Sequence, residues 1–157
     1  MNDAHLHLLV NHIPILGTLF GIGILIGGIL FRNKVVKNCA YLLFITSAIC
    51  ALLAMNTGEG AEELVEDLPN IGHQIIHEHE EITEKFVILM YVLGAFSILG
   101  LVANQKNHAK AKLLAIIIVA LGLINFAVGT KVGTTGGEIR HTEIRSNYNP
   151  SQTDTED

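Results

Sequence analysis

Four continuous apolar runs divide the 157-residue chain, and polar connections separate them. Each run holds about 17 to 24 residues without Asp, Glu, Lys or Arg, about the length that a helix needs to cross ~30 Å of hydrocarbon. Because the runs are apolar throughout rather than alternating, they predict helices and not the strands of a membrane barrel. We therefore expect an all-α integral membrane four-helix bundle, with helices at about residues 8–31, 39–55, 86–103 and 113–130.

Composition and helix-breaking residues refine this organisation. Hydrophobic residues make up 50% of the chain, more than soluble domains usually carry, and this excess indicates a lipid environment. Residues 1–145 are predicted to form one transmembrane domain with an acidic, histidine-rich connection at 56–85, and residues 146–157 a disordered polar tail. Pro14 cannot donate a hydrogen bond to the carbonyl of Val10, so the first helix should start near His12 or kink there.

Charge is distributed unevenly between the two sides of the predicted bundle. All fifteen acidic residues lie in the N-terminus, the 56–85 connection and the C-terminal segment. The short connections after the first and third runs are basic and hold no acid; their basic residues are Arg32, Lys34, Lys37, Lys106, Lys110 and Lys112. Basic residues mark cytoplasmic loops, so we expect both termini and the 56–85 connection to lie outside the cytoplasm. The corresponding location is a bacterial inner membrane, crossed several times, with the acidic side facing the periplasm.

Histidines gather on the same predicted outer side. Only His108, among the lysines of the third connection, lies on the inner side, where we expect it to be solvated. Ionisable residues near membrane depth are candidates for function because hydrocarbon does not solvate them. The outer histidines are His5, His7, His12, His73, His77, His79 and His141.

Depth and helical face separate these histidines. At 1.5 Å per residue, His7 and His79 lie roughly 9 and 10 Å beyond the outer edges of the first and third runs, so they are predicted to be level. His12 lies at the edge itself and projects ~140° away from His7. On the third helix we expect His79 to face inward along a row of small and adaptable side chains, and His77 to face water.

Imidazoles at this depth predict a cofactor site. Two level imidazoles from different helices, His7 and His79, fit a bis-histidine haem b. A second haem would use His12 and His141. A turn at the Gly136–Gly137 pair is expected to bring His141 back over the bundle. The chain lacks C-x-x-C-H, which excludes covalent attachment of haem c. The candidate partners of the haem propionates are Arg140, Arg145 and Lys131.

A non-haem metal is the alternative ligand for these histidines. Neutral imidazole also binds zinc, copper and non-haem iron. The candidate ligands are His7, His12, His77, His79 and His141. The 56–85 connection adds two i,i+4 pairs, Glu59 with Glu63 and His73 with His77, a spacing that suits zinc or iron. The plainer alternative is that this connection is a solvated amphipathic segment.

These features favour an electron carrier or a subunit over a self-contained enzyme. No catalytic nucleophile or phosphate-binding loop is visible, and histidine at both axial positions of a haem leaves no open site for oxygen chemistry. The nine acids between residues 56 and 85 would steer a basic periplasmic electron carrier, and we expect no nucleic-acid partner. The alternative from another class is an accessory subunit of a membrane respiratory complex that works by helix packing, with or without a metal.

Three segments resemble a bacterial family of four-helix predicted membrane proteins of unknown function. They are "HLLVNHIPI" (7–15), "ALLAMNTGEGAEE" (51–63) and "VGTTGGEIRH" (132–141), and a histidine also precedes the third helix. The first helix of the family reads approximately H-P-x-x-V-H-F-P-[IV], and its end carries a Gly-Gly segment followed by histidine. The resemblance implies a redox setting and b-type haem, with His7, His12, His79 and His141 as the family histidines. This chain departs from the pattern at Leu8, where the family often has proline, and His77 beside His79 leaves two candidates on the third helix.

Overall fold

A computed structural model describes residues 2–66, 71–146 and 148, and these residues form helices and turns without a strand. The α1–α2 segment, α3, α4 and α5 are each long and apolar enough to cross a membrane, which agrees with the predicted all-α fold. The elements are α1 (Asp3–Val10), α2 (His12–Leu30), α3 (Lys34–Glu62), α4 (His73–Gln105), α5 (Ala111–Arg140) and the short 3-10 helix η1 (Thr142–Ile144).

Three of the helices extend well beyond their apolar runs. α3 continues to Glu62, α4 begins at His73, and α5 continues to Arg140, so most of the predicted 56–85 connection is helical. Hydropathy marks only the part of a helix that contacts lipid, whereas backbone hydrogen bonds and packing continue the helix into the polar region. The predicted tail at 146–157 lies outside the described residues except for Ser146 and Tyr148.

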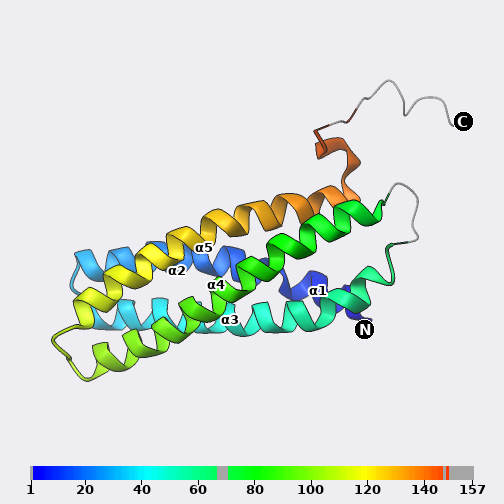
Figure 1. Cartoon of the computed structure of the whole chain (residues 1–157). Coiled ribbons are helices and arrows are strands. Elements are labelled where there is room, and N and C mark those ends of the chain that lie inside the picture. Colours follow the sequence, from blue (N-terminus) through cyan, green and yellow to red (C-terminus); the bar gives the residue numbers. More distant parts are fainter. Residues whose placement is uncertain (1, 67–70, 147, 149–157) are drawn as a thin grey trace, which may run out of the picture.

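The four long helices form an antiparallel ring in which each helix packs against the next and α5 closes on α2 (Figure 1). The α2–α3 and α4–α5 connections lie at one end, which we call the lysine end. The other end carries α1, the last turns of α3, the first turns of α4 and the end of α5, and we call it the histidine end. Both described chain ends lie at the histidine end (Figure 1).

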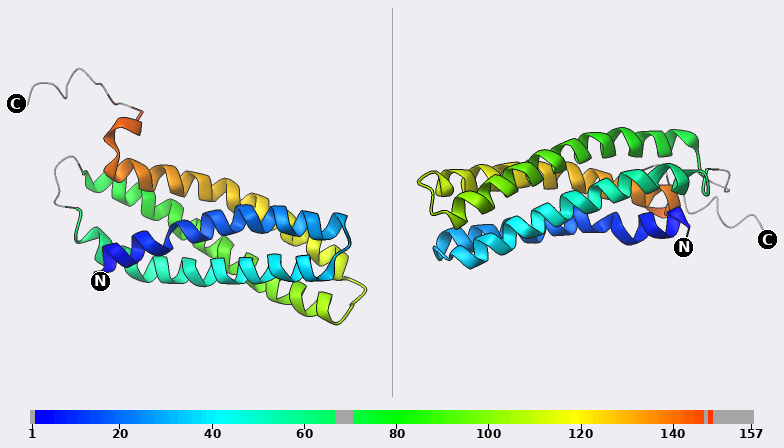
Figure 2. Two further views of the ribbon diagram at one scale, coloured as in Figure 1. Left: turned by 180° about the vertical axis from the view of Figure 1, so that it is seen from behind. Right: turned by 90° about the horizontal axis from the view of Figure 1, so that it is seen from below.

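The first apolar run is broken at Asn11, close to the predicted kink. Asn11 keeps helical dihedral angles, and its N–H still donates to the carbonyl of His7 at 2.9 Å, but Pro14 provides no N–H for the next turn. α1, which precedes the break, packs on α3 far more than on α2, as both views in Figure 2 show. Gly60 of α3 makes this approach possible, because a Cβ there would overlap the side chain of Asp3.

Both connections at the lysine end reverse the chain with a residue in the left-handed region. Arg32 and Asn107 each have φ 52°. The following N–H groups then donate back into the preceding helices, Asn33 to Gly28 and His108 to Ala103, a pattern that satisfies the last carbonyls of a helix. The side chain of Asn33 also caps the start of α3.

The bundle interior is closely packed by small residues against large ones. A Cβ on Gly21 would lie 2.5 Å from Phe44, and one on Gly100 would lie 2.9 Å from Tyr41, so these glycines let neighbouring helices approach closely. Large apolar side chains also cover the outer faces of all four long helices, which is compatible with a lipid bilayer environment. The largest apolar side chains of the interior are Leu25, Tyr41, Phe44, Met90, Leu93 and Ile118.

Candidate functional site

His7 is held against α3 by a hydrogen bond that fixes its tautomer. The ring is half-buried, and its Nδ1 lies 3.0 Å from the carbonyl oxygen of Ala54 and 3.4 Å from Oγ1 of Thr57. A carbonyl oxygen only accepts, so Nδ1 carries the proton in this bond and Nε2 keeps its lone pair in the neutral ring. Gly58 presents no side chain beside the ring; a Cβ there would lie 3.8 Å from Cε1 of His7.

His79 is held against α5 in the same way. Its Nδ1 lies 2.9 Å from Oγ1 of Thr135. The hydroxyl of Thr135 donates to the carbonyl oxygen of Lys131 at 3.1 Å, so its oxygen accepts from Nδ1–H of the ring. A Cβ on Gly136 would lie only 2.9 Å from Cε1 of His79, so the ring rests directly on the α5 backbone. The neutral ring therefore keeps its lone pair on Nε2, as in His7.

The two rings form a pair across the histidine end. His7 belongs to the α1–α3 pair of helices and His79 to the α4–α5 pair, yet the two rings lie close enough for their charges to interact. In both rings the hydrogen bonds within the described residues run through Nδ1. A histidine whose Nδ1–H is held by a carbonyl or hydroxyl while Nε2 is available has the arrangement of a metal ligand with its supporting contact.

The remaining outer histidines are solvent-facing. His77 is exposed and lies 3.5 Å from a carboxylate oxygen of Glu81, which agrees with the prediction that it faces water while His79 faces inward. His12, the first residue of α2, is also exposed. His73 lies beside Glu66 at 3.8 Å, and both side chains are at the polar surface.

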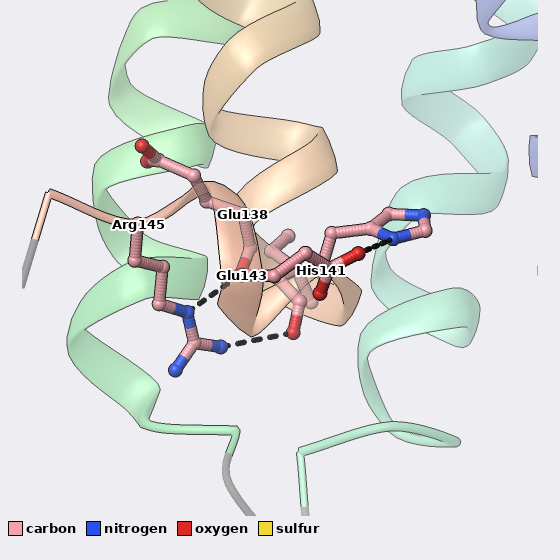
Figure 3. Close-up of polar contacts among 5 residues, drawn as sticks. Glu138, His141, Glu143 and Arg145 are labelled. Atoms are coloured by element: carbon pink, nitrogen blue, oxygen red, sulfur yellow. Dashed lines mark hydrogen bonds and ion pairs between the residues drawn. The ribbon is translucent and has the colours of Figure 1, made fainter. Parts of the chain in front are cut away.

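The prediction that Gly136–Gly137 turns the chain is wrong, because both glycines lie inside α5. The chain turns at His141, between the end of α5 and the start of η1. Figure 3 shows the His141 ring beside Glu143 at the end of α5. Its Nδ1 lies 2.9 Å from Oε1 of Glu143, and the ring is exposed. The second predicted pair, His12 with His141, stays a prediction: both rings are exposed, and His12 begins α2 while His141 directly follows α5.

The three basic residues predicted to pair with haem propionates have different surroundings at the histidine end. Arg145 folds back and donates from Nε to the carbonyl of Glu138 at 2.8 Å and from Nη2 to that of Ile139 at 3.2 Å, so it caps α5 (Figure 3). Arg140 is exposed. Lys131 lines an open groove of about 330 Å³ between α4 and α5, which also includes Thr135.

The predicted carboxylate site is only partly assembled. Glu62 of α3 and Glu80 of α4 lie near each other at the histidine end. Nevertheless, nowhere in the described parts of the chain do three or more His, Cys, Asp or Glu side chains converge as a metal ion requires. The acids of α4 in this segment, Glu78, Glu80, Glu81 and Glu84, are exposed.

The supporting groups of the histidine pair were not foreseen from the sequence. Ala54 acts through its backbone, which no residue pattern reveals, and Thr135 looks like one of several threonines. One signal was present: Thr135 lies next to Gly136 in the segment 132–141, which ends at His141. No family model, curated protein or solved structure matches this chain, so the chemistry of the pair is interpreted from its own geometry.

Proposed function

We propose that this protein is a membrane cytochrome b-like electron-transfer protein that holds haem b between His7 and His79. The observation that carries the proposal is the shared tautomer of the two rings, each held through Nδ1 with Nε2 available. An iron porphyrin bound there would supply one-electron oxidation and reduction. Since both axial positions would be filled by histidine, the site favours electron transfer over oxygen chemistry.

The residues around the pair fit a cofactor that takes only two protein ligands. Zinc and non-haem iron usually take three or four ligands from the protein, and no such group forms in the described residues. A porphyrin supplies four nitrogens itself and needs only two imidazoles. Gly58 and Gly136 let the two rings lie close to the backbones of α3 and α5, which supports a fixed orientation of both imidazoles.

The polar groups behind the rings would set their orientation. The carbonyl of Ala54 and the hydroxyl of Thr135 each accept a hydrogen bond from Nδ1–H, and this contact raises the basicity of the ring at Nε2. Arg140 and Lys131 are exposed cations on the last turns of α5 that would offset the charge of the propionates. Arg145 already donates hydrogen bonds to two carbonyls at the end of α5.

The setting we propose is a bacterial inner membrane with the histidine end in the periplasm. The basic residues gather at the opposite end, as expected for cytoplasmic loops. Exposed acids of α4, Glu78, Glu80, Glu81 and Glu84, give the histidine end a surface that would attract a small basic electron carrier. The chain would then pass electrons between that carrier and other respiratory components.

Haem loading of purified variants tests the proposal. The protein is expressed with added haem and purified in mild detergent, and its reduced-minus-oxidised spectrum and its haem content are measured. We expect a b-type band in the wild type and its loss in His7→Ala and His79→Ala. Matched controls are His5→Ala on α1 and His77→Ala on α4, which remove exposed histidines from the same helices and should leave the band unchanged.

Two outcomes would contradict the proposal. The first is a folded, membrane-inserted wild type without a b-type band. The second is a band that His77→Ala removes as completely as His79→Ala. Bound zinc, copper or iron without porphyrin would indicate the non-haem alternative, and a protein without metal that co-purifies with respiratory subunits would indicate the accessory subunit.

A further inference from the structure

A layer of polar and soft side chains crosses the middle of the bundle, far from the histidine pair. It consists of Thr18 of α2, Ser47 of α3, Met90 of α4 and Asn125 of α5, and we call it the central layer. Each of the four side chains is 0% exposed. Asn125 lies almost at the midpoint of α5 and inside its apolar run at 113–130, so the layer lies within the apolar span.

Contacts and helix register place these four side chains at one depth. Oγ1 of Thr18 lies 3.5 Å from the sulfur of Met90. Ser47 packs against Gly17 of α2, the residue that precedes Thr18. A Cβ on Gly17 would overlap Oγ of Ser47.

Asn125 faces Thr18 across the α2–α5 interface. On α5, Gly129 would contact Ile15 and Gly122 would contact Ile22 if they carried a Cβ. Asn125 lies between the two glycines, and Thr18 lies between the two isoleucines at the matching position. The two residues are therefore opposite each other in two antiparallel helices.

The central layer has more hydrogen-bonding capacity than the described residues use. Neither Oδ1 nor Nδ2 of Asn125 has a hydrogen-bond partner there, and neither does Oγ of Ser47. The hydroxyl of Thr18 donates to the carbonyl of Pro14 at 2.7 Å, so its oxygen is left as an acceptor. Lipid tails offer no partner, and buried polar groups are rarely left without one.

We propose that the central layer binds water between Thr18, Ser47 and Asn125. Buried water typically makes about three hydrogen bonds, and these three side chains provide both donors and acceptors for it. Met90 closes the layer on the α4 side, where its sulfur lies 3.5 Å from Oγ1 of Thr18. Such water would give the apolar bundle a group that both donates and accepts protons midway between its two ends. This inference is independent of any haem at the histidine end.

Proton NMR of the side-chain amide of Asn125 tests the inference. The protein is labelled with 15N-asparagine and studied in deuterated detergent, and Asn125→Leu identifies the Nδ2 signals by their loss. We expect a cross-peak between the Nδ2 protons and a long-lived water in the wild type. Ser47→Ala removes one of the three side-chain partners and should reduce the cross-peak by about half.

The matched control is Ser97→Ala, which removes another fully buried hydroxyl without a partner in the described residues, located outside the central layer. It should leave the cross-peak unchanged. The inference is overturned if the wild-type Nδ2 protons show no cross-peak to water, for example because Asn125 bonds directly to Thr18. It is equally overturned if Ser97→Ala weakens the cross-peak as much as Ser47→Ala. The wild-type measurement decides the matter even if a variant fails to fold.

Discussion

Replacing Gly136 by alanine would test how closely His79 rests on α5. The new Cβ would lie 2.9 Å from Cε1 of His79, whereas ordinary contact begins near 3.4 Å, so the ring must retreat by about 0.5 Å. That retreat stretches the 2.9 Å bond between Nδ1 of His79 and Oγ1 of Thr135. The matched control is Gly133→Ala, one turn earlier on α5, whose Cβ would meet Ile15 at an ordinary 3.7 Å.

The two variants should differ in stability by about 2 kcal/mol. Each gains about 0.5–1 kcal/mol because alanine favours the helix over glycine. In Gly136→Ala this gain is offset by about 1–3 kcal/mol for the overlap and by part of the 0.5–1.5 kcal/mol that a hydrogen bond contributes. For a chain of this size, about 2 kcal/mol corresponds to a difference in Tm of about 4–8 °C.

Thermal unfolding in detergent measures this difference, and 15N NMR of labelled histidine reports whether the His79 ring has moved. We expect Gly133→Ala to be at least as stable as the wild type and Gly136→Ala to be the less stable of the two, with a shifted His79 signal. Equal stability of the two variants together with an unchanged His79 signal would refute the close contact between the ring and the α5 backbone.

Three other predictions follow from local contacts. In Gly21→Ala the new Cβ would lie 2.5 Å from Phe44, so this variant should destabilise the bundle by about 1–3 kcal/mol. Gly23→Ala, whose Cβ would have no neighbour within 4 Å, should not, and equal Tm values of the two variants would contradict this. Asn104→Ala removes bonds to the carbonyl of Lys34 at 3.0 Å and to Oδ1 of Asn38 at 2.6 Å, and it should cost about 1–3 kcal/mol in detergent unfolding. A loss no larger than that of Gln105→Ala, which changes an exposed neighbour on α4, would contradict this. The backbone N–H of Glu143 and the His141 ring hold the pKa of Glu143 below its ordinary 4.5, so this contact is present above pH 4.5 and is lost as the pH falls through the folded pKa. His141→Ala should raise that pKa in an NMR titration, and an unchanged midpoint would argue against the contact.

The sequence determined the helical class and the number of membrane-length helices. Runs such as 86–103 are apolar on every face, and only helices satisfy their backbone within one segment in lipid. Pro14 also predicted the break near Asn11, because a missing N–H acts locally and needs no partner to be recognised. The ends of the helices were predicted less well, because polar segments such as 56–62 are helical through packing and not through hydropathy.

The histidine pair was predicted from depth and face, since both follow from the fixed geometry of a helix. Gly136 was misread as a turn residue because glycine serves both turns and close packing, and only a neighbour such as His79 reveals which role applies. The contacts that orient the rings could not be read from the chain. The carbonyl of Ala54 and the hydroxyl of Thr135 meet His7 and His79 only after helices far apart in sequence pack together, so the tertiary structure alone decides which ring nitrogen carries the proton.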